Sequence, residues 1–450
     1  MVQSNLMNFK VKKGKGVTGE ITIPGDKSIS HRSIMCASLS EGKSKIYGFL
    51  EGEDCLATKL AFKDMGVKFE TSNDGIIVHG SGLHGLKEPK EEINLGNSGT
   101  SIRLLSGILS AQNFSSTLVG DESLSSRPMN RIIEPLSLMG ANIKSQNSGR
   151  PPLEINKSDM LNSIHYDLPI ASAQVKSCIL FASLYSEGKT IVKEKQITRN
   201  HTEIMFEQFG VPLSIQDTED GRSIEMHPPS NLKGTEIDIP GDFSSAAFFI
   251  LAALIIPNSN LTIKNVGMNE TRTALLNAFQ EMGAEIEIFN KTAEFEPRAD
   301  LKVKFSKLKG INLDAKLVPN LIDELPSFFV AAAMSSGSTA VRDAEELRHK
   351  ESDRLEAMGN VLRSLGVDLN MHQDGMDIYG LDQHQALSCY TGGIIESFGD
   401  HRIAMSSAIA CSLFDHESLI LNTDNVNTSF PTFLKIANQV GLNISLEEHS

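Results

Sequence analysis

The chain has 450 residues and carries 42 Lys and Arg against 56 Asp and Glu, which gives a formal net charge of −14. Its length allows about three domains of roughly 150 residues each, and its acidity argues against a surface that binds nucleic acid or anionic lipid throughout. A composition that is 40% hydrophobic and 22% charged excludes a disordered chain and a membrane protein.

The N-terminal segment has no apolar stretch of the secretory type. The longest apolar run, 246–256, has 11 residues, whereas a membrane span needs about 20. We therefore expect a cytoplasmic protein. The cysteines are odd in number and have no Cys-x-x-Cys spacing, so we predict buried free thiols rather than disulfides or a metal site.

One sequence pattern occurs six times along the chain: an amphipathic run that ends at a glycine, followed by an alternating stretch. The glycines, on average 75 residues apart, are Gly66, Gly140, Gly210, Gly283, Gly366 and Gly441. Each copy predicts a helix whose last turn closes on a left-handed glycine and leads directly into a strand. The fold class is therefore predicted to be α/β, built from six copies of one unit.

A second repeat divides the six copies into two halves. The sequence Ile-Pro-Gly-Asp at 23–26 recurs at 239–242, which is 216 residues later. We predict one domain over 24–239 and a second domain made of 1–23 together with 240–450. Neither junction has a linker rich in Gly, Ser or Pro, so we expect two closely apposed domains with a cleft.

The first copy of this turn, in 24–32, opens a helix. Its Pro-Gly-Asp explains a bend and a helix cap, but the second copy keeps that turn and has phenylalanine where the first has Lys27 and Arg32. The fold therefore does not require these cations. Because the helix dipole favours anions at this end, Lys27, Ser28 and Arg32 are predicted to bind phosphate or carboxylate.

Two segments that follow repeat this logic. Residues 94–105 combine a glycine-rich turn at Gly96 and Gly99 with Arg103 in the first helical turn, which predicts a second anion-binding loop. Arg127 precedes a proline, is therefore extended, and is either an exposed loop residue or part of the same site.

Two more helix starts carry polar side chains. Ser172 is predicted as a helix cap or as part of a pocket, with Gln174 in the first turn. Asn200 and Glu203 have the spacing of a capping box. Arg199, just before that helix, is either solvated or a ligand of an anion.

The candidate acids and bases come from the second half. Asp323 and Glu324 precede a buried helix, and Asp323 is a helix cap or an acid/base group. Lys350 and Arg354 are four residues apart, with Glu351 between them, and share a helix face if this segment is helical. A solvent-exposed helix with salt bridges is the alternative.

Arg402 begins another apolar helix, after Asp400 and His401. Several cationic helix starts, two candidate carboxylates and no metal or nucleotide motif together predict one class of reaction. It joins or cleaves small anionic molecules by proton transfer and electrostatic stabilisation in a domain cleft.

Seven motifs, in this order, resemble the 5-enolpyruvylshikimate-3-phosphate synthase (3-phosphoshikimate 1-carboxyvinyltransferase) family: PGDKSISHR, LGNSGTSIR, SRPM, SAQVKS, DELP, KESDR and GDHRIAMS. The resemblance implies two similar domains, each of three βαβαββ-type repeats with helices packed inward, as an inverse α/β barrel. It also implies that the chain crosses twice between the domains and that the active site lies in the interdomain cleft.

The resemblance implies transfer of the enolpyruvyl group from phosphoenolpyruvate to the 5-hydroxyl of shikimate 3-phosphate, with release of phosphate, on the pathway to chorismate and aromatic amino acids. No cofactor or metal is implied. We expect a cytoplasmic monomer with small-molecule substrates and without nucleic acid or membrane partners.

The implied catalytic residues are Asp323 as base on the hydroxyl, Glu351 as acid toward the methylene, and Lys27 in either proton movement. The implied shikimate 3-phosphate ligands are Lys27, Ser28, Arg32, Ser172, Ala173, Gln174, Arg199, Asp323 and Lys350. The implied phosphoenolpyruvate ligands are Lys27, Gly99, Arg127, Gln174, Arg354 and Arg402.

The chain departs from the family's pattern at two places. Many members have a lysine shortly before a Phe-Pro near the C-terminus, where this chain has Thr428 and Ser429, and His349 replaces an expected aliphatic residue. Gly99 has no methyl group, which implies room for the inhibitor glyphosate and a sensitive enzyme.

Two rival functions remain open at this stage. An enolpyruvyltransferase acting on a UDP-N-acetylglucosamine substrate uses a cysteine in the loop before an Arg-Pro dipeptide, and this chain reads DESLSSRP there. A clamp-like binding ring of six repeats needs lysines repeated in every unit, whereas Lys27 and Arg32 are unique to one copy.

Overall fold

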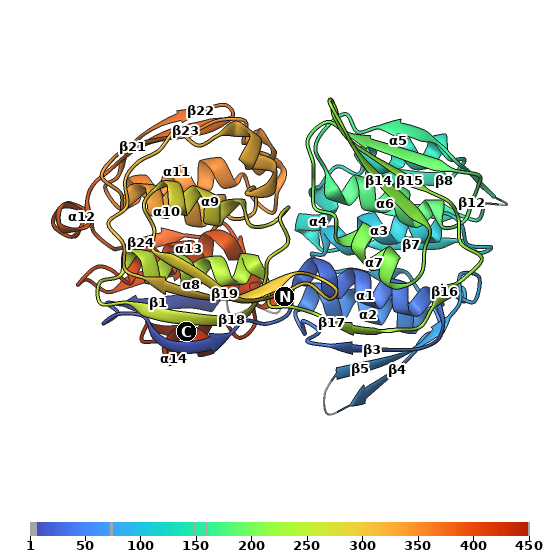
Figure 1. Cartoon of the computed structure of the whole chain (residues 1–450), viewed down its shortest axis with the longest axis horizontal. Helices are drawn as coiled ribbons and strands as arrows, with labels where there is room; N and C mark the ends of the chain where they lie inside the picture. Colours follow the sequence, from blue (N-terminus) through green and yellow to red (C-terminus); the bar gives the residue numbers. More distant parts are fainter. Residues whose placement is uncertain (1–6, 73–74, 147–148, 159, 449–450) are drawn as a thin grey trace. The chain divides into compact units, whose positions relative to one another are not determined.

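The computed structural model describes residues 7–72, 75–146, 149–158 and 160–448. The chain divides into two units (Figure 1). The continuous unit spans residues 25–239, and the discontinuous unit combines residues 1–24 with 240–450. Each unit is described by itself.

All six repeat glycines end helices, as predicted. Their φ angles lie between 78° and 105°, and the next backbone N–H donates back into the last turn, as Val67 does to the carbonyl of Phe62 at 3.0 Å. The helices are α2 (Glu53–Asp64), α5 (Asn130–Leu138), α7 (His201–Gln208), α9 (Ala274–Glu281), α11 (Arg354–Ser364) and α14 (Phe433–Gln439). The strands that follow them are β4 (Lys68–Ser72), β8 (Asn142–Gln146), β14 (Leu213–Thr218), β19 (Ile286–Thr292), β22 (Asp368–His372) and β26 (Asn443–Glu448).

A second set of helices forms the centre of each unit. In the continuous unit they are α1 (Lys27–Leu39), α3 (Gly99–Leu109) and α6 (Ala173–Ser183), and in the discontinuous unit α8 (Phe243–Ile255), α10 (Leu325–Ala333) and α13 (His401–Cys411). Every residue of α8 and α10 is buried. A helix that is apolar on all sides must be enclosed, which explains why the sheets lie outside these helices.

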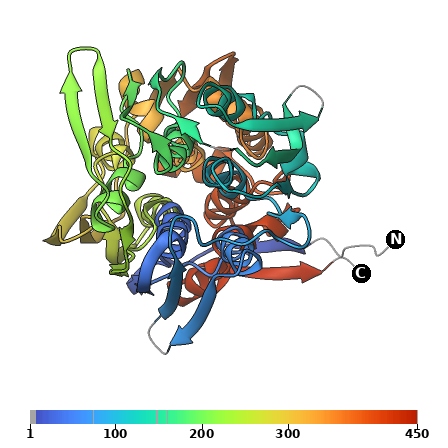
Figure 2. The ribbon, with the colours of Figure 1, turned by 90° about the vertical axis from the view of Figure 1, so that its right-hand side faces the viewer.

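The sheets of the continuous unit share one pairing pattern: a parallel pair at one edge, followed by antiparallel neighbours. Their strands run in the orders β16-β3-β5-β4 with β17 also on β3, β6-β7-β9-β8, and β11-β13-β15-β14. The new members are β3 (Ser40–Tyr47), β5 (Gly75–Ser81), β6 (Ile93–Asn94), β7 (Ser116–Val119), β9 (Arg150–Asn156), β11 (His165–Asp167), β13 (Thr190–Glu194), β15 (Gly221–Met226), β16 (Leu232–Lys233) and β17 (Glu236–Asp238). A short pair, β10 (Leu161–Asn162) and β12 (Ser186–Glu187), and the helix α4 (Glu122–Ser126) complete the unit. Figure 2 shows the β4–β5 hairpin, drawn in blue, extending away from the helices of its unit.

The N-terminal segment supplies two strands to the discontinuous unit. The strand β1 (Met7–Lys12) lies between β25 (Ser418–Leu421) and β26, and β2 (Thr18–Thr22) pairs parallel with β18 (Asn260–Gly267). The remaining strands are β20 (Arg298–Lys304), β21 (Gly337–Val341), β23 (Gly375–Gly380) and β24 (Ile394–Glu396). The short helix α12 (Gln383–Cys389) and the 3₁₀ helices η1 (Ala315–Asn320), η2 (Glu345–His349) and η3 (Asp424–Thr428) lie in the connections. The predicted α/β class with inward-packed helices is thus confirmed.

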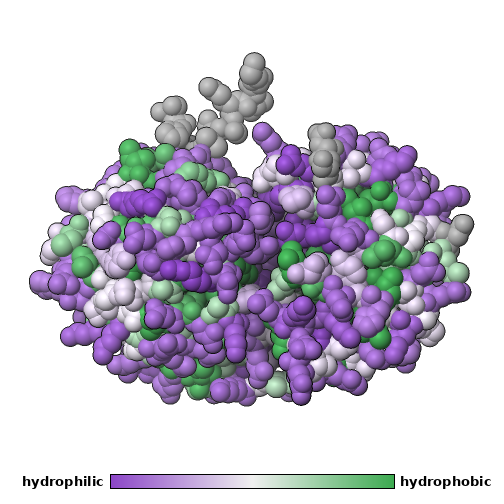
Figure 3. All heavy atoms as spheres, turned by 90° about the horizontal axis from the view of Figure 1, so that it is seen from above, coloured by the Kyte–Doolittle hydropathy of each residue, from purple (hydrophilic) through white to green (hydrophobic). Residues whose placement is uncertain are grey.

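The face of the protein drawn in Figure 3 is largely polar. On the face drawn in Figure 3, hydrophilic residues cover most of the area and hydrophobic residues form small separate groups. None of the helices in the described ranges combines the length and the apolar character that a membrane crossing requires.

The prediction that all cysteines are buried is wrong at one position. Cys36, Cys55, Cys178 and Cys411 are free and buried, whereas Cys389 is free and exposed. Cys389 ends α12, a seven-residue helix in which Ala386 is the buried residue. A short connecting helix of this kind has one side against the unit and leaves its last residue in solvent.

Candidate functional site

The start of α1 carries a cation that is held by a carboxylate. Asp26 caps the helix by accepting a hydrogen bond from the Ile29 N–H at 2.9 Å. Lys27 is the first helical residue, and its Nζ forms an ion pair with Asp54 near the start of α2. The Lys27 side chain remains 18% exposed, so its ammonium group can contact both Asp54 and solvent.

Arg32 lies one turn further along α1 and is buried. Its Nε donates to Thr202 Oγ1 at 2.6 Å, its Nη2 donates to Ser177 Oγ at 2.7 Å, and its Nη1 donates to the Ser28 carbonyl at 2.9 Å. Burial lowers the pKa of Arg32 to about 10, an effect that the charge of Glu203 opposes. The guanidinium is therefore positively charged at neutral pH and fixed in orientation.

A buried ion cluster lies next to these Arg32 contacts. Lys176 of α6 is fully buried and lies 3.1 Å from Glu194 Oε1 and 2.7 Å from Glu203 Oε1. Burial raises the pKa of Glu194, while the Lys176 charge and a hydrogen bond from Thr198 oppose that rise. Lys176 and Glu203 adjoin the two hydroxyl residues that hold Arg32, so the cluster ties α6 and α7 together behind it.

This cluster corrects one expectation about Glu203. Asn200 is the N-cap of α7 but makes no side-chain capping bond, and Glu203 contacts Lys176 instead. The capping-box prediction is wrong because a buried lysine is a stronger partner for the carboxylate than a backbone N–H. The sequence does contain one signal: Lys176 is the one charged residue in the helix α6.

The α3 start places a glycine against two arginines. Ser98 caps the helix by accepting from the Ser101 N–H at 3.2 Å. A Cβ atom on Gly99 would lie 3.0 Å from Arg127 Nη1 and 3.2 Å from Arg103 Nη1. A side chain at this position would therefore press on both guanidinium groups and move them slightly away from the backbone.

Side-chain hydrogen bonds join the α3 start to neighbouring segments. Arg103 Nη1 donates to Gln174 Oε1 at 2.5 Å, and Gln174 Nε2 donates to Thr100 Oγ1 at 3.0 Å. Arg127 Nη2 donates to Asn97 Oδ1 at 2.5 Å. The possibility that Arg127 is an exposed loop residue is excluded, because its exposed fraction is 7%.

The other predicted residues of this unit lie at neighbouring helix starts. Ser172 caps α6 by accepting from the Val175 N–H at 3.4 Å, and Ala173 is the first helical residue. Arg199 is half-buried, precedes α7, and interacts electrostatically with Arg32.

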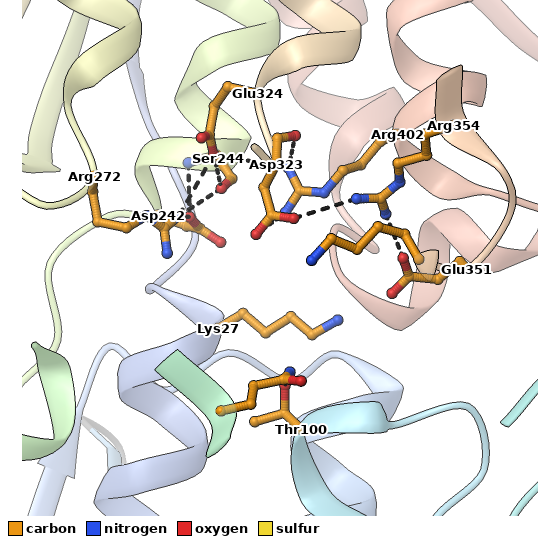
Figure 4. Close-up of polar contacts among 12 residues, drawn as sticks. Lys27, Thr100, Asp242, Ser244, Arg272, Asp323, Glu324, Glu351, Arg354 and Arg402 are labelled. Atoms are coloured by element: carbon orange, nitrogen blue, oxygen red, sulfur yellow. Dashed lines mark hydrogen bonds and ion pairs between the residues drawn. The ribbon is translucent and has the colours of Figure 1, made fainter. Parts of the chain in front are cut away.

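In the discontinuous unit, Arg354 is surrounded by carboxylates (Figure 4). Its side chain is 1% exposed, and its donors lie 2.8 Å from Asp400 Oδ2, 2.6 Å from Glu351 Oε2 and 3.3 Å from Asp323 Oδ1. Burial disfavours the charged form, but the three carboxylates outweigh burial and raise the pKa of Arg354. Arg354 therefore fixes the two candidate proton-transfer groups, Asp323 and Glu351, on one guanidinium.

The structure corrects the expectation of one helical face for Lys350 and Arg354. The helix α11 begins only at Arg354, because the Asp353 side chain caps it by accepting from the Glu356 N–H at 3.0 Å. Lys350 lies before the cap and is 3.4 Å from Glu346 Oε1. The alternative of a solvent-exposed helix with salt bridges is also wrong, since Arg354 is buried.

Arg402 and Asp400 organise the start of α13. Asp400 caps the helix by accepting from the Arg402 N–H at 2.9 Å. Burial favours the neutral form of Asp400, yet its pKa is lowered because Arg354 stabilises the carboxylate. Arg402 Nη1 donates to the Asp323 carbonyl at 2.8 Å, and its Nη2 lies 3.9 Å from Asp323 Oδ2.

Asp323 does not act as a helix cap. The N-cap of α10 is Glu324, and it makes no side-chain capping bond. The Asp323 carboxylate instead faces Arg354 and Arg402, with a side-chain exposure of 16%. Two guanidinium groups, and not a capping bond, therefore orient this carboxylate.

The start of α8 holds a cation, Arg272, that the sequence did not reveal. Asp242 caps this helix, and Arg272 Nη2 lies 3.3 Å from Asp242 Oδ1, 2.5 Å from Ser244 Oγ and 3.7 Å from Glu324 Oε1. Ser244 Oγ also donates to Glu324. Arg272 is distant in sequence from the turn that it completes, so no local pattern predicts it.

Of the positions that depart from the family pattern, Thr428 and Ser429 are buried and His349 is exposed. Thr428 Oγ1 donates to the Asn425 carbonyl at 2.7 Å. Ser429 is buried, and its hydroxyl has no hydrogen-bond partner among the described residues. His349 is exposed at the end of η2. Among the described residues, no group of three or more His, Cys, Asp and Glu side chains is arranged to hold a metal ion.

Comparison with known proteins gives one consistent result. Residues 11–436 match the family model described as EPSP synthase (3-phosphoshikimate 1-carboxyvinyltransferase). A 3-phosphoshikimate 1-carboxyvinyltransferase of Legionella pneumophila is 49% identical over 99% of this chain and 100% of its own length. One of Methylococcus capsulatus is 47% identical over 97% of this chain and 98% of its own length. The solved structure of EPSP synthase from Acinetobacter baumannii superposes with a TM-score of 0.86 at 45% identity, covering 98% of this chain and 100% of that one. The chain, with its cationic helix starts and its carboxylates on Arg354, belongs to the EPSP synthase family.

Proposed function

We propose that the protein is a 3-phosphoshikimate 1-carboxyvinyltransferase. It transfers the enolpyruvyl group of phosphoenolpyruvate to the 5-hydroxyl of shikimate 3-phosphate and releases phosphate, on the pathway to chorismate and aromatic amino acids. Full-length similarity to enzymes of this name supports the proposal. The structural observation that carries the proposal is that Asp323 and Glu351 both pair with the buried guanidinium of Arg354.

Both substrates are anions, and the helix starts provide backbone N–H groups and cationic side chains that bind anions. We assign shikimate 3-phosphate to residues at the starts of α1, α6 and α7 and to two residues of the discontinuous unit: Lys27, Ser28, Arg32, Ser172, Ala173, Gln174, Arg199, Asp323 and Lys350. We assign phosphoenolpyruvate to Lys27, Gly99, Arg127, Gln174, Arg354 and Arg402. Backbone N–H groups at helix starts together with guanidinium groups favour phosphate and carboxylate oxygens.

The addition step needs two proton movements, and the elimination step needs a third. Asp323 takes the proton of the 5-hydroxyl as the hydroxyl oxygen attacks C2 of phosphoenolpyruvate, while Glu351 gives a proton to the methylene carbon. The tetrahedral adduct then returns a proton from the new methyl group to the Glu351 carboxylate and expels phosphate, which restores the vinyl group. Lys27 takes part in either proton movement of the addition, and the guanidinium groups stabilise the charge that moves onto the departing phosphate.

Glu351 must hold a proton to act as the acid, whereas its carboxylate lies 2.6 Å from Arg354 Nη2. Phosphoenolpyruvate and Glu351 compete for the same guanidinium in this assignment. Binding of the substrate anion therefore weakens the ion pair and favours protonation of Glu351.

We also propose that glyphosate inhibits the enzyme. Because Gly99 has no Cβ, Arg127 and Arg103 lie close to this backbone, and both cations attract an anionic inhibitor. We expect Gly99→Ala to reduce inhibition, because the added methyl group presses on Arg127. Activity of the native enzyme that is unchanged at high glyphosate concentration contradicts this proposal.

The proposed setting is a cytoplasmic monomer with small-molecule substrates. The net charge of −14 supports the expectation of no nucleic acid or anionic membrane partner, and size-exclusion chromatography with light scattering tests the monomer. The rival substrate UDP-N-acetylglucosamine is disfavoured because serines, Ser125 and Ser126, stand directly before Arg127 in place of a cysteine.

One assay separates these functions. Phosphate release from phosphoenolpyruvate is measured with shikimate 3-phosphate, with UDP-N-acetylglucosamine, and with neither acceptor. We expect release with shikimate 3-phosphate alone. Release with the nucleotide sugar supports the rival enzyme, and no release in any arm overturns both enzyme assignments.

A further inference from the structure

Four buried side chains of the continuous unit form an unbroken chain of hydrogen bonds. His31 Nδ1 lies 2.7 Å from Thr58 Oγ1, Thr58 Oγ1 lies 2.6 Å from Ser101 Oγ, and Ser101 Oγ lies 2.6 Å from Ser98 Oγ. All four residues are fully buried. They come from α1, α2 and the start of α3, so the chain, called here the hydroxyl relay, connects three helices.

The donor in the first hydrogen bond of the relay follows from the protonation state of its histidine. Burial lowers the pKa of His31 well below 6.5, and the charges of Lys27 and Arg32 lower it further, so the ring is neutral. His31 Nε2 is buried without a hydrogen-bond partner among the described residues. A buried N–H without an acceptor is rarer than a lone pair without a donor, so the ring proton belongs on Nδ1.

With that tautomer, His31 Nδ1–H donates to Thr58 Oγ1. The Thr58 and Ser101 hydroxyls share a hydrogen bond of 2.6 Å, and the Asp54 carbonyl is a second acceptor at 3.4 Å from Thr58 and 3.5 Å from Ser101. Ser98 Oγ hydrogen-bonds to the Ser101 hydroxyl and accepts from the Ser101 backbone N–H that it caps. Ser101 and Thr58 therefore connect the α3 N-cap to α2.

The two ends of the relay adjoin residues assigned to the two substrates. His31 directly precedes Arg32 in α1, and Ser98 directly precedes Gly99 at the start of α3. The centre of the relay touches the segment that holds Lys27, because the Asp54 carbonyl lies 3.4 Å from Thr58 Oγ1 and the Asp54 side chain pairs with Lys27. The relay thus joins the α1 start to the α3 start.

We propose that Thr58 and Ser101 are positioning residues, which hold the Gly99 turn at a fixed place relative to α1 and thereby set the affinity for phosphoenolpyruvate. The inference rests on the proposed function. The α8 copy of the turn has Ala247 at the position of His31. The relay is therefore specific to the continuous unit, in which the starts of α1 and α3 are assigned to the substrates.

The central test removes one hydroxyl and keeps its shape. In the full-length enzyme, Thr58→Val is expected to raise the KM for phosphoenolpyruvate by about fivefold, the size of one lost hydrogen bond, with kcat changed by less than about twofold. Thr58→Ser restores the hydroxyl and is expected to restore the KM. Ser101→Ala is a second variant with the same expected KM effect, in case Thr58→Val does not fold.

Ser106→Ala is the matched control. Ser106 is also fully buried on α3, but its hydroxyl donates to the Ile102 carbonyl of its own helix at 2.7 Å. We expect this variant to lower the melting temperature without changing the KM. A KM for phosphoenolpyruvate that is equal in Thr58→Val and Ser106→Ala overturns the inference.

A stability measurement tests the relay without any substrate. Because Thr58 and Ser101 act through one another, the melting temperature of the double variant Thr58→Val/Ser101→Ala should fall by less than the sum of the two single shifts. Additive shifts overturn the relay. If the native enzyme releases no phosphate from its proposed substrates, the proposed function fails, and the melting experiment still decides whether the relay exists.

Discussion

The helices α1 and α8 both follow the sequence Ile-Pro-Gly-Asp, and each is capped by the aspartate of that turn. At α1 the next residues bring Lys27 and Arg32. At α8 the equivalent positions are Phe243 and Phe248, which are buried in the core of their unit. The two helices thus share the turn and its aspartate cap, and they differ in the side chains that follow: cations at α1 and buried phenylalanines at α8.

The two helix starts also differ in how their cations are balanced. Lys27 at α1 is partly exposed and paired with Asp54. The cation at α8, Arg272, comes from another segment, is 4% exposed, and faces both Asp242 and Glu324. At the α8 start the cation is enclosed and its charge is balanced within the turn, whereas the partly exposed Lys27 can also contact a ligand. Position in a repeat therefore does not assign function; the surroundings of the charge do.

The largest expected effect is on catalysis, and it distinguishes Asp323 from its sequence neighbour Glu324, which contacts the α8 start. Asp323→Asn and Glu351→Gln should each lower kcat by about 10²- to 10⁴-fold, the usual contribution of a general acid or base, and leave substrate binding largely intact. Glu324→Gln serves as the comparison, since Glu324 contacts Ser244 and Arg272 and should affect stability first. Steady-state kinetics with binding titrations measures both, and near-normal turnover in either variant removes that residue from the proton transfers.

Arg272→Met tests the stabilising role of the α8 start. It leaves two buried carboxylates without their shared cation, so we expect the free energy of unfolding to fall by about 3–5 kcal/mol. Arg222→Met is the control, because Arg222 pairs with the largely exposed Asp217 at 2.6 Å and should cost about 0–1 kcal/mol. Denaturant unfolding measures both changes, and equal costs would contradict the distinction drawn between buried and exposed pairs.

Lys27→Met tests the binding role of the α1 start. We expect kcat/KM to fall by about 100-fold, the effect of removing one group that stabilises transition-state charge, with a small change in melting temperature. Phe243→Leu at the equivalent position of α8 should give the reverse: a loss of about 1–2 kcal/mol in stability and little change in rate. If Lys27→Met lowers the stability without lowering the rate, then Lys27 stabilises the fold as Phe243 does, and its proposed binding role is wrong.

The smallest expected effect is a pH dependence confined to the α1 start. The pKa of His31 in the folded protein lies well below 6.5, so below about pH 6.5 the unfolded chain binds a proton that the folded protein does not. Stability is therefore full above pH 6.5 and falls as the pH decreases, by at most about 1.4 kcal/mol per pH unit from this residue. His31→Asn should show a shallower acid loss in melting scans from pH 7 to 5. A parallel pair of curves for the two proteins would remove His31 as the source.

Features carried by contiguous residues were predictable from the sequence. The glycine that ends each repeat helix, and the strand after it, depend on a few neighbouring positions, and all six were predicted. The Ile-Pro-Gly-Asp turns and their aspartate caps are local in the same sense. The order of seven motifs was enough to identify the family.

Contacts between distant segments were not predictable in this way. Arg32 is held by Ser177 and Thr202, which lie 145 and 170 residues away. The partners of Lys176 and Arg272 are similarly remote from any local pattern. The expectation for Lys350 and Arg354 failed for a local reason, because Asp353 caps a helix that begins at Arg354 and Lys350 therefore lies outside it.

The pairing of β1 has a consequence for how the chain is made. Its neighbours, β25 and β26, lie within residues 418–448 and are synthesised last, whereas residues 25–239 form an uninterrupted unit that is complete much earlier. The continuous unit can therefore fold on the ribosome while β1, with Phe9 and Val11 destined for the core, waits as an unpaired strand. A nascent chain that stops short of β25 leaves β1 without either neighbouring strand. In such a fragment only the continuous unit can reach its native fold, and the unpaired β1 favours aggregation.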